Sequence, residues 1–175
     1  MNDGKAAAMK LPLFAACALA AFALPAAAQQ SAPEDPAQSL AQSSAWHNLQ
    51  QSSLYAANGA EGYSLLEGGV RFKRTAGNGT GGAPTVRDIV SVNYTGRFAD
   101  GQVFDSNVGR EPATFPLSRL IRAWQIAIPY MGIGDTAEIA VPMEVGYGPQ
   151  GGGPIPGGAT LFFTIELLDV SRAPG

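Results

Sequence analysis

A regular alternation of apolar and polar residues is the feature that most restricts how this chain folds. Between residues 90 and 95 apolar and polar side chains alternate, and between residues 161 and 167 every second residue is apolar. A period of two is typical of β-strands that bury one face. Asp100-Gly101 follows the first stretch and is a hairpin signal, so residues 102–105 are expected to return as an antiparallel strand. The sequence therefore predicts an antiparallel sheet. Two shorter strands are expected at residues 70–73 and 137–141.

One short helix and many turns complete the expected domain. Ser118 is a candidate N-cap for a helix that carries apolar residues up to Ile128, and Pro129 is expected to end it. The chain contains 22 glycines and 13 prolines, which argues against a helical bundle. Residues 148–158 hold six glycines and three prolines. Because such a loop is costly to order, it is a candidate binding loop.

The first 28 residues are typical of a secretory signal peptide. Lys5 and Lys10 precede an apolar run of roughly 14 residues, which is shorter than the ~20 residues that span a membrane, so stable membrane insertion is not expected. Small residues follow the run, and we expect cleavage after Ala28, export, and a periplasmic location. Translation from Met1 or from Met9 fits this pattern. Lipid attachment at Cys17 is the alternative, disfavoured because the apolar segment before it is very short.

A polar linker and a helical segment are expected between the signal peptide and the sheet. Residues 29–35 are too polar to bury a core. Asp35-Pro36 is a helix-start signal and Asn58-Gly59 a stop signal, so residues 36–64 are expected to be helical in large part. The apolar residues of this segment do not form a clean stripe, which predicts a monomer or a weak dimer. Its histidine, His47, is interpreted as a surface or capping residue.

Composition excludes several classes of function. Eleven basic residues stand against 14 acidic ones, a formal net charge of −3, and no basic run follows the chain, so nucleic acid is not an expected partner. The sequence contains one histidine and one cysteine. Multi-ligand zinc sites, internal disulfides and catalytic triads with a buried histidine are therefore excluded, and no metal ion or other cofactor is expected.

Four groups of motifs stand in one order along the chain. They are Tyr94-Thr95-Gly96, then Asp100-Gly101 with Phe104-Asp105-Ser106, then Phe115-Pro116-Leu117 leading to Ile121-Arg122-Ala123-Trp124, and last Val145-Gly146-Tyr147-Gly148 before Ala159-Thr160-Leu161-Phe162-Phe163. In this order they resemble the FKBP-type peptidyl-prolyl cis-trans isomerases, in particular the exported bacterial group that includes the macrophage infectivity potentiator proteins. The resemblance covers residues 65–171. It implies an α+β fold in which an antiparallel sheet half wraps around a short α-helix and is preceded by an N-terminal helix.

The resemblance also implies where the active site lies. Trp124 is expected to form the floor of an apolar cavity for a prolyl ring, with Asp105 against the reacting amide. The Tyr147 hydroxyl and the backbone N–H of Ile121 are expected to donate to the substrate. Apart from the resemblance, the position of Arg110 five residues after Asp105 suggests a charge-assisted pair between these two side chains. The residues expected to act in catalysis are Asp105, Tyr147, Trp124, Phe104 and Tyr94, and those expected to bind substrate are Leu120, Ile121, Phe163, Leu161, Arg110, Ile155 and Phe115.

These residue types fit a reaction that needs neither a nucleophile nor a metal ion. Rotation about an X–Pro bond is opposed by the loss of amide resonance, a barrier of about 18–20 kcal/mol. An apolar cavity disfavours the charge-separated planar amide, and a few oriented polar groups favour the twisted one. The expected function is peptidyl-prolyl isomerisation in proline-containing unfolded or exported polypeptides, and macrolide inhibitors are candidate ligands. The alternative is a non-catalytic chaperone or peptide-binding module that uses the same cavity.

Overall fold

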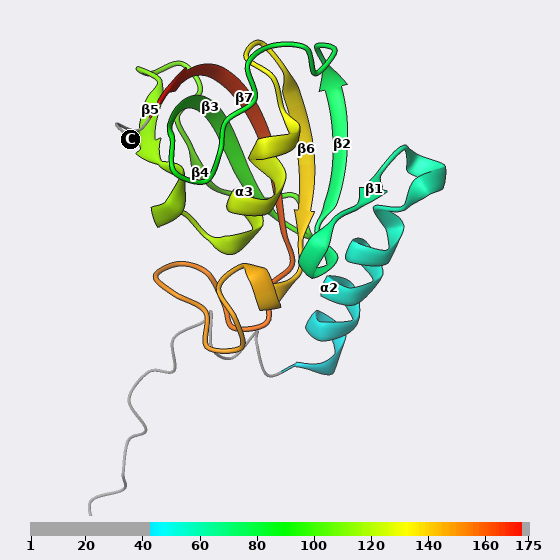
Figure 1. Cartoon of the computed structure of the whole chain (residues 1–175). Helices are drawn as coiled ribbons and strands as arrows, with labels where there is room; N and C mark the ends of the chain where they lie inside the picture. The colour runs from blue at the N-terminus through cyan, green and yellow to red at the C-terminus, as the bar shows by residue number, and fades with distance from the viewer. Residues whose placement is uncertain (1–42, 173–175) are drawn as a thin grey trace, which may run out of the picture. The chain divides into compact units, whose positions relative to one another are not determined.

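The structure is built on one antiparallel sheet (Figure 1). The computed structural model describes residues 43–172. Within these residues seven strands form the sheet, in the order β1-β2-β6-β7-β3-β4, and β5 pairs with a part of β3 that β4 leaves free. Every pair of neighbouring strands is antiparallel. The strands are β1 (Ser64–Leu65), β2 (Arg71–Ala76), β3 (Ile89–Phe98), β4 (Val103–Ser106), β5 (Ala113–Pro116), β6 (Thr136–Val141) and β7 (Leu161–Ser171).

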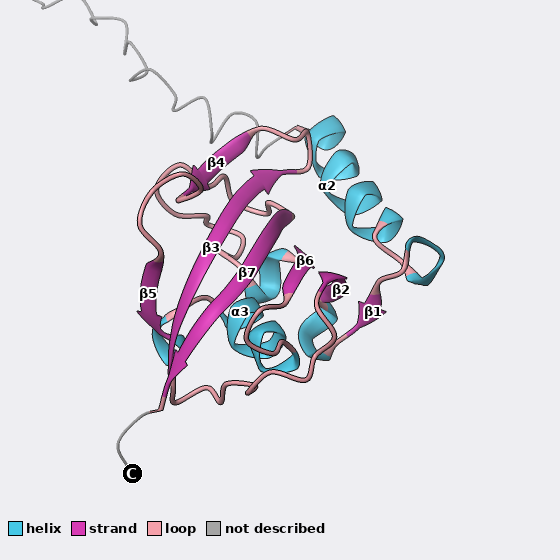
Figure 2. Ribbon diagram, turned by 90° about the horizontal axis from the view of Figure 1, so that it is seen from above, coloured by secondary structure: helices cyan, strands magenta, loops and turns pink. Residues whose placement is uncertain are grey.

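The two long strands, β3 and β7, follow the alternation seen in the sequence. They pair along their whole lengths, from Ile89 opposite Ser171 to Phe98 opposite Leu161. The alternating apolar side chains are buried on one face, which the helix α3 (Arg122–Ala127) covers (Figure 2). The expected antiparallel sheet around a short helix is confirmed. The residues that β3 and β7 contribute to this core are Val90, Val92, Leu161, Phe163, Ile165 and Leu167.

The hairpin predicted at Asp100-Gly101 is also confirmed. The backbone N–H of Gly101 donates to the carbonyl of Phe98 at 2.9 Å, and the Phe98 N–H donates to the carbonyl of Gln102 at 2.8 Å. Gly101 has a φ of 89°, a conformation that glycine adopts without strain. The turn returns the chain as the edge strand β4 beside β3, which places Asp105 opposite Gly96 of β3.

The prediction that Ser118 caps the short helix is wrong. Ser118 lies in a separate 3₁₀ turn, Leu117–Arg119, and the N-cap position of α3 is Ile121, without a side-chain cap hydrogen bond. The first residue of that turn is fully buried, so core packing fixes the turn ahead of the helix and overrides the capping preference of serine. Pro129 does not end the helical path either, because it lies inside a further 3₁₀ turn, Ile128–Tyr130.

A buried carboxylate fixes the chain before β6. The Asp135 side chain is 2% exposed and accepts hydrogen bonds from Arg74 Nε at 2.9 Å and from the backbone N–H groups of Gly132 at 2.8 Å and Gly79 at 3.1 Å. Burial opposes ionisation, yet these donors, the Gly132 and Gly79 N–H groups first and then Arg74, hold the pKa of Asp135 below its ordinary value. The ionised carboxylate therefore joins two loops to the end of β2.

Within residues 43–172 the helix α2 (Ser44–Ala56) precedes the sheet (Figures 1 and 2). It begins at Ser44 because the Ser43 side chain accepts a hydrogen bond from the Trp46 N–H at 3.1 Å. It ends before Asn58, as expected. The helix start predicted at Asp35-Pro36 lies outside the described residues, as do the predicted signal peptide and linker. No helix within residues 43–172 is long and apolar enough to cross a membrane.

The second half of α2 lies over the face of the sheet that points away from α3. Ser53 and Ala57 of the helix border a shallow depression together with Lys73, Glu138 and Phe162. Phe162 alternates with the buried residues of β7, so it points to the outer face. The sheet thus lies between α3 on one side and α2 on the other (Figure 2).

Candidate active site

A small aromatic cavity lies between α3, β3 and the strands beside β3. Its volume is about 200 Å³. The strands β4 and β5 pair with one edge of β3, one after the other, and β7 pairs with the opposite edge. All four of these strands contribute residues to the cavity wall. The lining residues are Tyr94, Phe104, Asp105, Phe115, Arg119, Leu120, Ile121, Trp124, Tyr147 and Phe163.

Trp124 lies at the centre of the aromatic lining. Its side chain is 4% exposed, and its ring meets Tyr94 at 5.3 Å and Phe163 at 5.4 Å between centroids. Both contacts are edge-to-face, with interplanar angles of 81° and 90°. Phe104 extends the cluster by a perpendicular contact with Phe163 at 5.6 Å. Perpendicular pairs of this kind hold the rings in fixed positions, so the cavity has rigid apolar walls.

A glycine makes this aromatic packing possible. Gly96 lies in β3, and a Cβ atom at this position would come within 2.6 Å of the Phe104 ring and 2.9 Å of the Phe163 ring. Such distances are too short for carbon atoms, so a larger residue would push these rings out of place. The packing of these rings therefore explains the glycine of the motif Tyr94-Thr95-Gly96.

Tyr94 and Asp105 form a hydrogen-bonded pair in the cavity wall. The Tyr94 hydroxyl donates to Asp105 Oδ2. Burial, the hydrogen bond to Asp105 and the nearby negative charge raise the pKa of Tyr94 to about 12. The phenol therefore keeps its proton at neutral pH and continues to orient the carboxylate.

Asn107 fixes the loop that follows Asp105. It is 7% exposed, its Oδ1 accepts the Tyr94 N–H at 2.7 Å, and its Nδ2 donates to the carbonyls of Val92 at 3.1 Å and Glu111 at 3.3 Å. The three bonds join the loop after β4 to β3 and set the position of Asp105.

Within the described residues several hydrogen-bond donors of the cavity are left without a protein partner, among them the buried indole N–H of Trp124. Within residues 43–172 nothing accepts a hydrogen bond from the Tyr147 hydroxyl or from the backbone N–H of Ile121. Both residues line the cavity, and Tyr147 is 40% exposed. Neither donor is therefore occupied within the described part of the chain, and the binding of a peptide that the resemblance implies for both stays a prediction.

Nine of the twelve predicted site residues line the cavity, and three do not. Leu161 is 1% exposed and belongs to the core, and Ile155, a member of the glycine-rich loop, is 4% exposed. Arg110 is exposed, and the expected ion pair between Arg110 and Asp105 is absent from the described part of the chain, where Asp105 is bound by Tyr94 instead. Arg119 lines the cavity and was not predicted, because no motif marks a cation within a 3₁₀ turn.

Comparison with known proteins identifies the family. A sequence model of the FKBP-type peptidyl-prolyl cis-trans isomerases matches residues 81–168. The chain belongs to this family. The matched FKBP region contains nearly all of β3 to β7, the helix α3 and every residue that lines the aromatic cavity.

Individual relatives agree with this assignment. The FKBP-type 22 kDa peptidyl-prolyl cis-trans isomerase of Escherichia coli (strain K12) is 43% identical over 112 residues, which are 63% of this chain and 54% of that protein. The FK506-binding protein 1 of Saccharomyces cerevisiae is 34% identical over 111 residues, 61% of this chain and 97% of that protein. The crystal structure of FkpA from Escherichia coli superposes with a TM-score of 0.67 at 33% identity and covers 73% of this chain and 59% of that one. This FKBP chain spans about half the length of the bacterial relatives it matches.

Proposed function

We propose that this protein is a peptidyl-prolyl cis-trans isomerase whose active site is the aromatic cavity. The observation that carries the proposal is a rigid apolar cavity of about 200 Å³, floored by Trp124, in a chain of the FKBP family. The cavity suits a prolyl ring in size and in its apolar walls. Residues 65–171 are the proposed isomerase domain.

The proposed mechanism relies on desolvation and on orientation of the substrate. The planar X–Pro amide is more charge-separated than the twisted amide, so transfer into a cavity walled by aromatic rings disfavours the planar form. The Ile121 N–H and the Tyr147 hydroxyl donate to substrate carbonyls and hold the peptide in place. Asp105, oriented by Tyr94, lies beside the reacting amide and favours a pyramidal nitrogen over a conjugated one. Each of these roles is part of the proposal.

Arg119 adds a cation at the edge of the cavity. Its guanidinium carries several N–H donors, so we assign it to the binding of carbonyl groups in the chain that flanks the proline. The other predicted binding residues that line the cavity, Leu120, Phe115 and Phe163, supply apolar contact to the ring.

The proposed substrates are proline-containing segments of exported, unfolded polypeptides. The cavity is open on the surface and its polar donors bind main-chain groups, so the substrate is an extended peptide rather than a folded protein. The sequence pattern of residues 1–28 supports export by a cleaved signal peptide and a periplasmic location. Two bacterial relatives are named FkpA and outer membrane protein MIP.

An isomerisation assay tests the activity. We expect the purified protein to accelerate the protease-coupled cis-to-trans conversion of a proline tetrapeptide, and an FK506-type macrolide to compete for the cavity, as the name of the yeast relative suggests for that protein. A protein that suppresses aggregation of unfolded chains but shows no isomerisation above background contradicts the proposal and supports the non-catalytic chaperone.

The intact mass of the protein from a periplasmic fraction tests export. We expect a chain that starts at Gln29. A diacylglyceryl-modified chain that starts at Cys17 contradicts the cleaved, unanchored form.

We further propose that the protein is a monomer or a weak dimer. The helix α2 turns its buried and half-buried side chains toward its own sheet domain rather than toward solvent. They are Trp46, Gln50, Ser53 and Leu54, with Ala57 at the C-cap position. Light scattering that shows a tight dimer lost on deletion of α2 contradicts this.

A further inference from the structure

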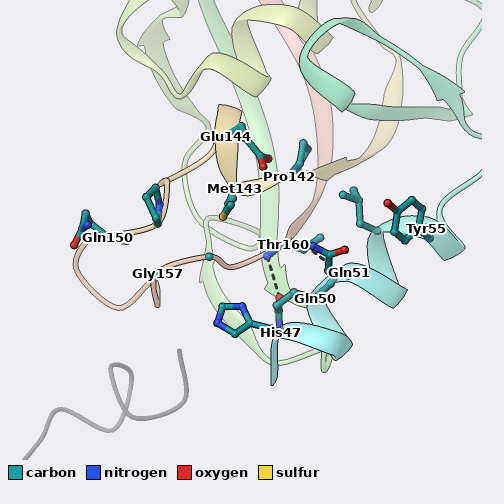
Figure 3. A pocket seen from close by; sticks show the side chains of 13 residues that line it. His47, Gln50, Gln51, Tyr55, Pro142, Met143, Glu144, Gln150, Gly157 and Thr160 are labelled. Carbon is teal, nitrogen blue, oxygen red and sulfur yellow. Dashed lines mark hydrogen bonds between the residues drawn. The ribbon is translucent and has the colours of Figure 1, made fainter. Parts of the chain in front are cut away.

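A glutamine of α2 is buried against the chain that leads into β7. Gln50 is 4% exposed, and its Oε1 accepts the backbone N–H of Thr160 at 2.9 Å (Figure 3). The Gln50 backbone carbonyl also accepts the Thr160 hydroxyl at 3.0 Å. Thr160 is itself 4% exposed, so both hydrogen bonds are buried. Loss of one partner would leave a buried polar group unpaired, which is more unfavourable than the loss of an exposed bond.

A second contact lies one turn earlier on α2. The rings of Trp46 and His47 meet edge-to-face at 5.4 Å, and Gly158 lies against both of them. A Cβ atom at Gly158 would be 3.3 Å from His47 Cε1 and 3.6 Å from the Trp46 ring. Gly158 also has a φ of 80°, which side-chain-bearing residues rarely adopt. The backbone of the loop therefore rests directly on the first turn of α2.

Gly158 is joined by one hydrogen bond to the other end of the glycine-rich loop, residues 148–158, which directly follows Tyr147 and is called the active-site loop below. The Gly158 N–H donates to the carbonyl of Gly148 at 2.9 Å, and the Gly148 N–H donates to the carbonyl of Met143 at 2.9 Å. Gly148 directly follows Tyr147, whose ring lines the aromatic cavity. A short chain of contacts thus leads from α2 through Gly158 and Gly148 to Tyr147.

The contacts with α2 are localised. A groove of about 620 Å³ separates much of the helix from the loop (Figure 3). It is bordered by Gln51 and Tyr55 on the helix, by Gln150 on the loop, and by Glu144 in the 3₁₀ turn Met143–Val145 that precedes the loop. The residues between positions 146 and 158 include seven glycines, which lose much conformational entropy when they become ordered. The few points at which such a loop is held therefore decide how well it is ordered.

We propose that α2 positions the active-site loop, with Gln50 as the positioning residue. Gln50 holds Thr160, the neighbouring rings hold Gly158, and these two points fix Tyr147 at the mouth of the cavity. This inference rests on the proposed isomerase function and adds that a helix outside the matched FKBP region controls substrate binding. Because the helix acts on a binding group, its loosening weakens the Michaelis complex more than it slows bond rotation.

Steady-state kinetics of matched variants test the proposal. Gln50→Met removes the accepting oxygen and keeps the size and helix propensity of the side chain, Gln50→Glu keeps an acceptor, and Gln51→Met is the control on the exposed neighbouring position. We expect Gln50→Met to raise KM for a proline tetrapeptide about 2- to 12-fold, the equivalent of one hydrogen bond, with kcat within about twofold. Gln50→Glu is expected to restore most of the loss, and Gln51→Met to change neither constant.

A double-mutant cycle shows whether the effect passes through Tyr147. In a Tyr147→Phe background the hydroxyl to be positioned is gone, so Gln50→Met is expected to change KM by less than about twofold. An equal effect of Gln50→Met in both backgrounds overturns the proposal, because general destabilisation acts without Tyr147.

Amide hydrogen exchange of the free protein separates this inference from the proposed function. We expect faster exchange of the Gly148 and Gly158 amides in Gln50→Met, and a smaller change of the same kind in Thr160→Val, which removes only the hydroxyl bond and serves if Gln50→Met does not fold. Unchanged exchange at both amides overturns the positioning role. If the wild type lacks isomerase activity, the proposed function fails, and the exchange result still decides whether α2 orders the loop.

Discussion

Replacement of Trp124 by alanine is the most direct test of the aromatic cavity. The ring is 4% exposed and makes perpendicular contacts with Tyr94 and Phe163, so its removal leaves a hole beneath the site. Truncation of a buried tryptophan costs about 3–5 kcal/mol of the free energy of unfolding. The free energy of unfolding of a small domain is about 5–15 kcal/mol, so the variant is expected to fold with a lowered melting temperature.

Below the melting temperature of the Trp124→Ala variant almost all molecules are folded, so the lowered stability does not by itself reduce activity. A loss of activity measured there reports on the cavity. A prolyl ring without its floor loses the burial of an aliphatic side chain, about 1.5–3 kcal/mol. This corresponds to a decrease in kcat/KM of about 10- to 150-fold in the protease-coupled assay, measured well below the melting temperature of the variant.

Phe72→Ala is the matched control for stability. Phe72 is 7% exposed in β2 and does not line the cavity, so its truncation removes a similar core contact without changing the site. We expect Phe72→Ala to lower the melting temperature comparably and to keep kcat/KM within about threefold at a temperature where it is folded. Wild-type activity in a folded Trp124→Ala variant, or an equal loss in Phe72→Ala, would refute the assignment of the cavity.

Three further predictions concern polar groups. Tyr94→Phe removes the donor that orients Asp105 and is expected to lower kcat/KM about 2- to 12-fold. The control Tyr63→Phe removes a hydroxyl that donates to Glu138 and should keep kcat/KM within about twofold of the wild type. Equal effects of the two changes would contradict the role of the Tyr94–Asp105 pair. We expect kcat/KM to change little between pH 6 and 8, because no histidine or cysteine lines the cavity and the pKa of Tyr94 is raised to about 12. A steep pH dependence of kcat/KM that His47→Ala abolishes would contradict this. The lowered pKa of Asp135 stabilises the fold above its unfolded pKa of about 3.9, and this stabilisation is lost as the pH falls through the lower, folded value. In denaturant titrations Asp135→Asn should therefore lower the free energy of unfolding by about 1.5–3 kcal/mol at pH 7 and by much less at pH 2. An equal decrease at both pH values would show that the charge of Asp135 is not responsible.

The sequence predicted those parts of the fold that depend on local pattern. β3 (Ile89–Phe98) contains the alternating residues 90–95, and the turn at Asp100-Gly101 forms as expected, because both depend on neighbouring residues alone. The start of α3 was wrong, because it depends on packing of the preceding turn against strands that are distant in sequence. Local preference is a weak guide where tertiary contacts compete with it.

In the candidate active site, too, the features carried by local motifs were predicted, and those that depend on contacts between distant residues were not. The aromatic lining was found because ordered motifs carry it, and nine of those residues lie around one cavity. The partner of Asp105 was wrong: spacing along the chain suggested Arg110, whereas pairing of β4 with β3 brings Tyr94 to it. Asn107 and Gln50 were not recognised, since their roles arise from contacts across 13 and 110 positions of the sequence.

The place of β7 has a consequence for how the chain folds as it is synthesised. β7 is the last strand of the described chain, yet it lies in the middle of the sheet, between β6 and β3. Before it emerges, the half made of β1, β2 and β6 shares no strand pairing with the half made of β3, β4 and β5. The edges of β6 and β3 therefore stay open until residues 161–171 have left the ribosome and can pair, and unpaired edges of this kind invite association with other chains. Nascent chains that stop short of β7 are expected to be degraded or to aggregate, while the loss of residues before α2 leaves the sheet able to close.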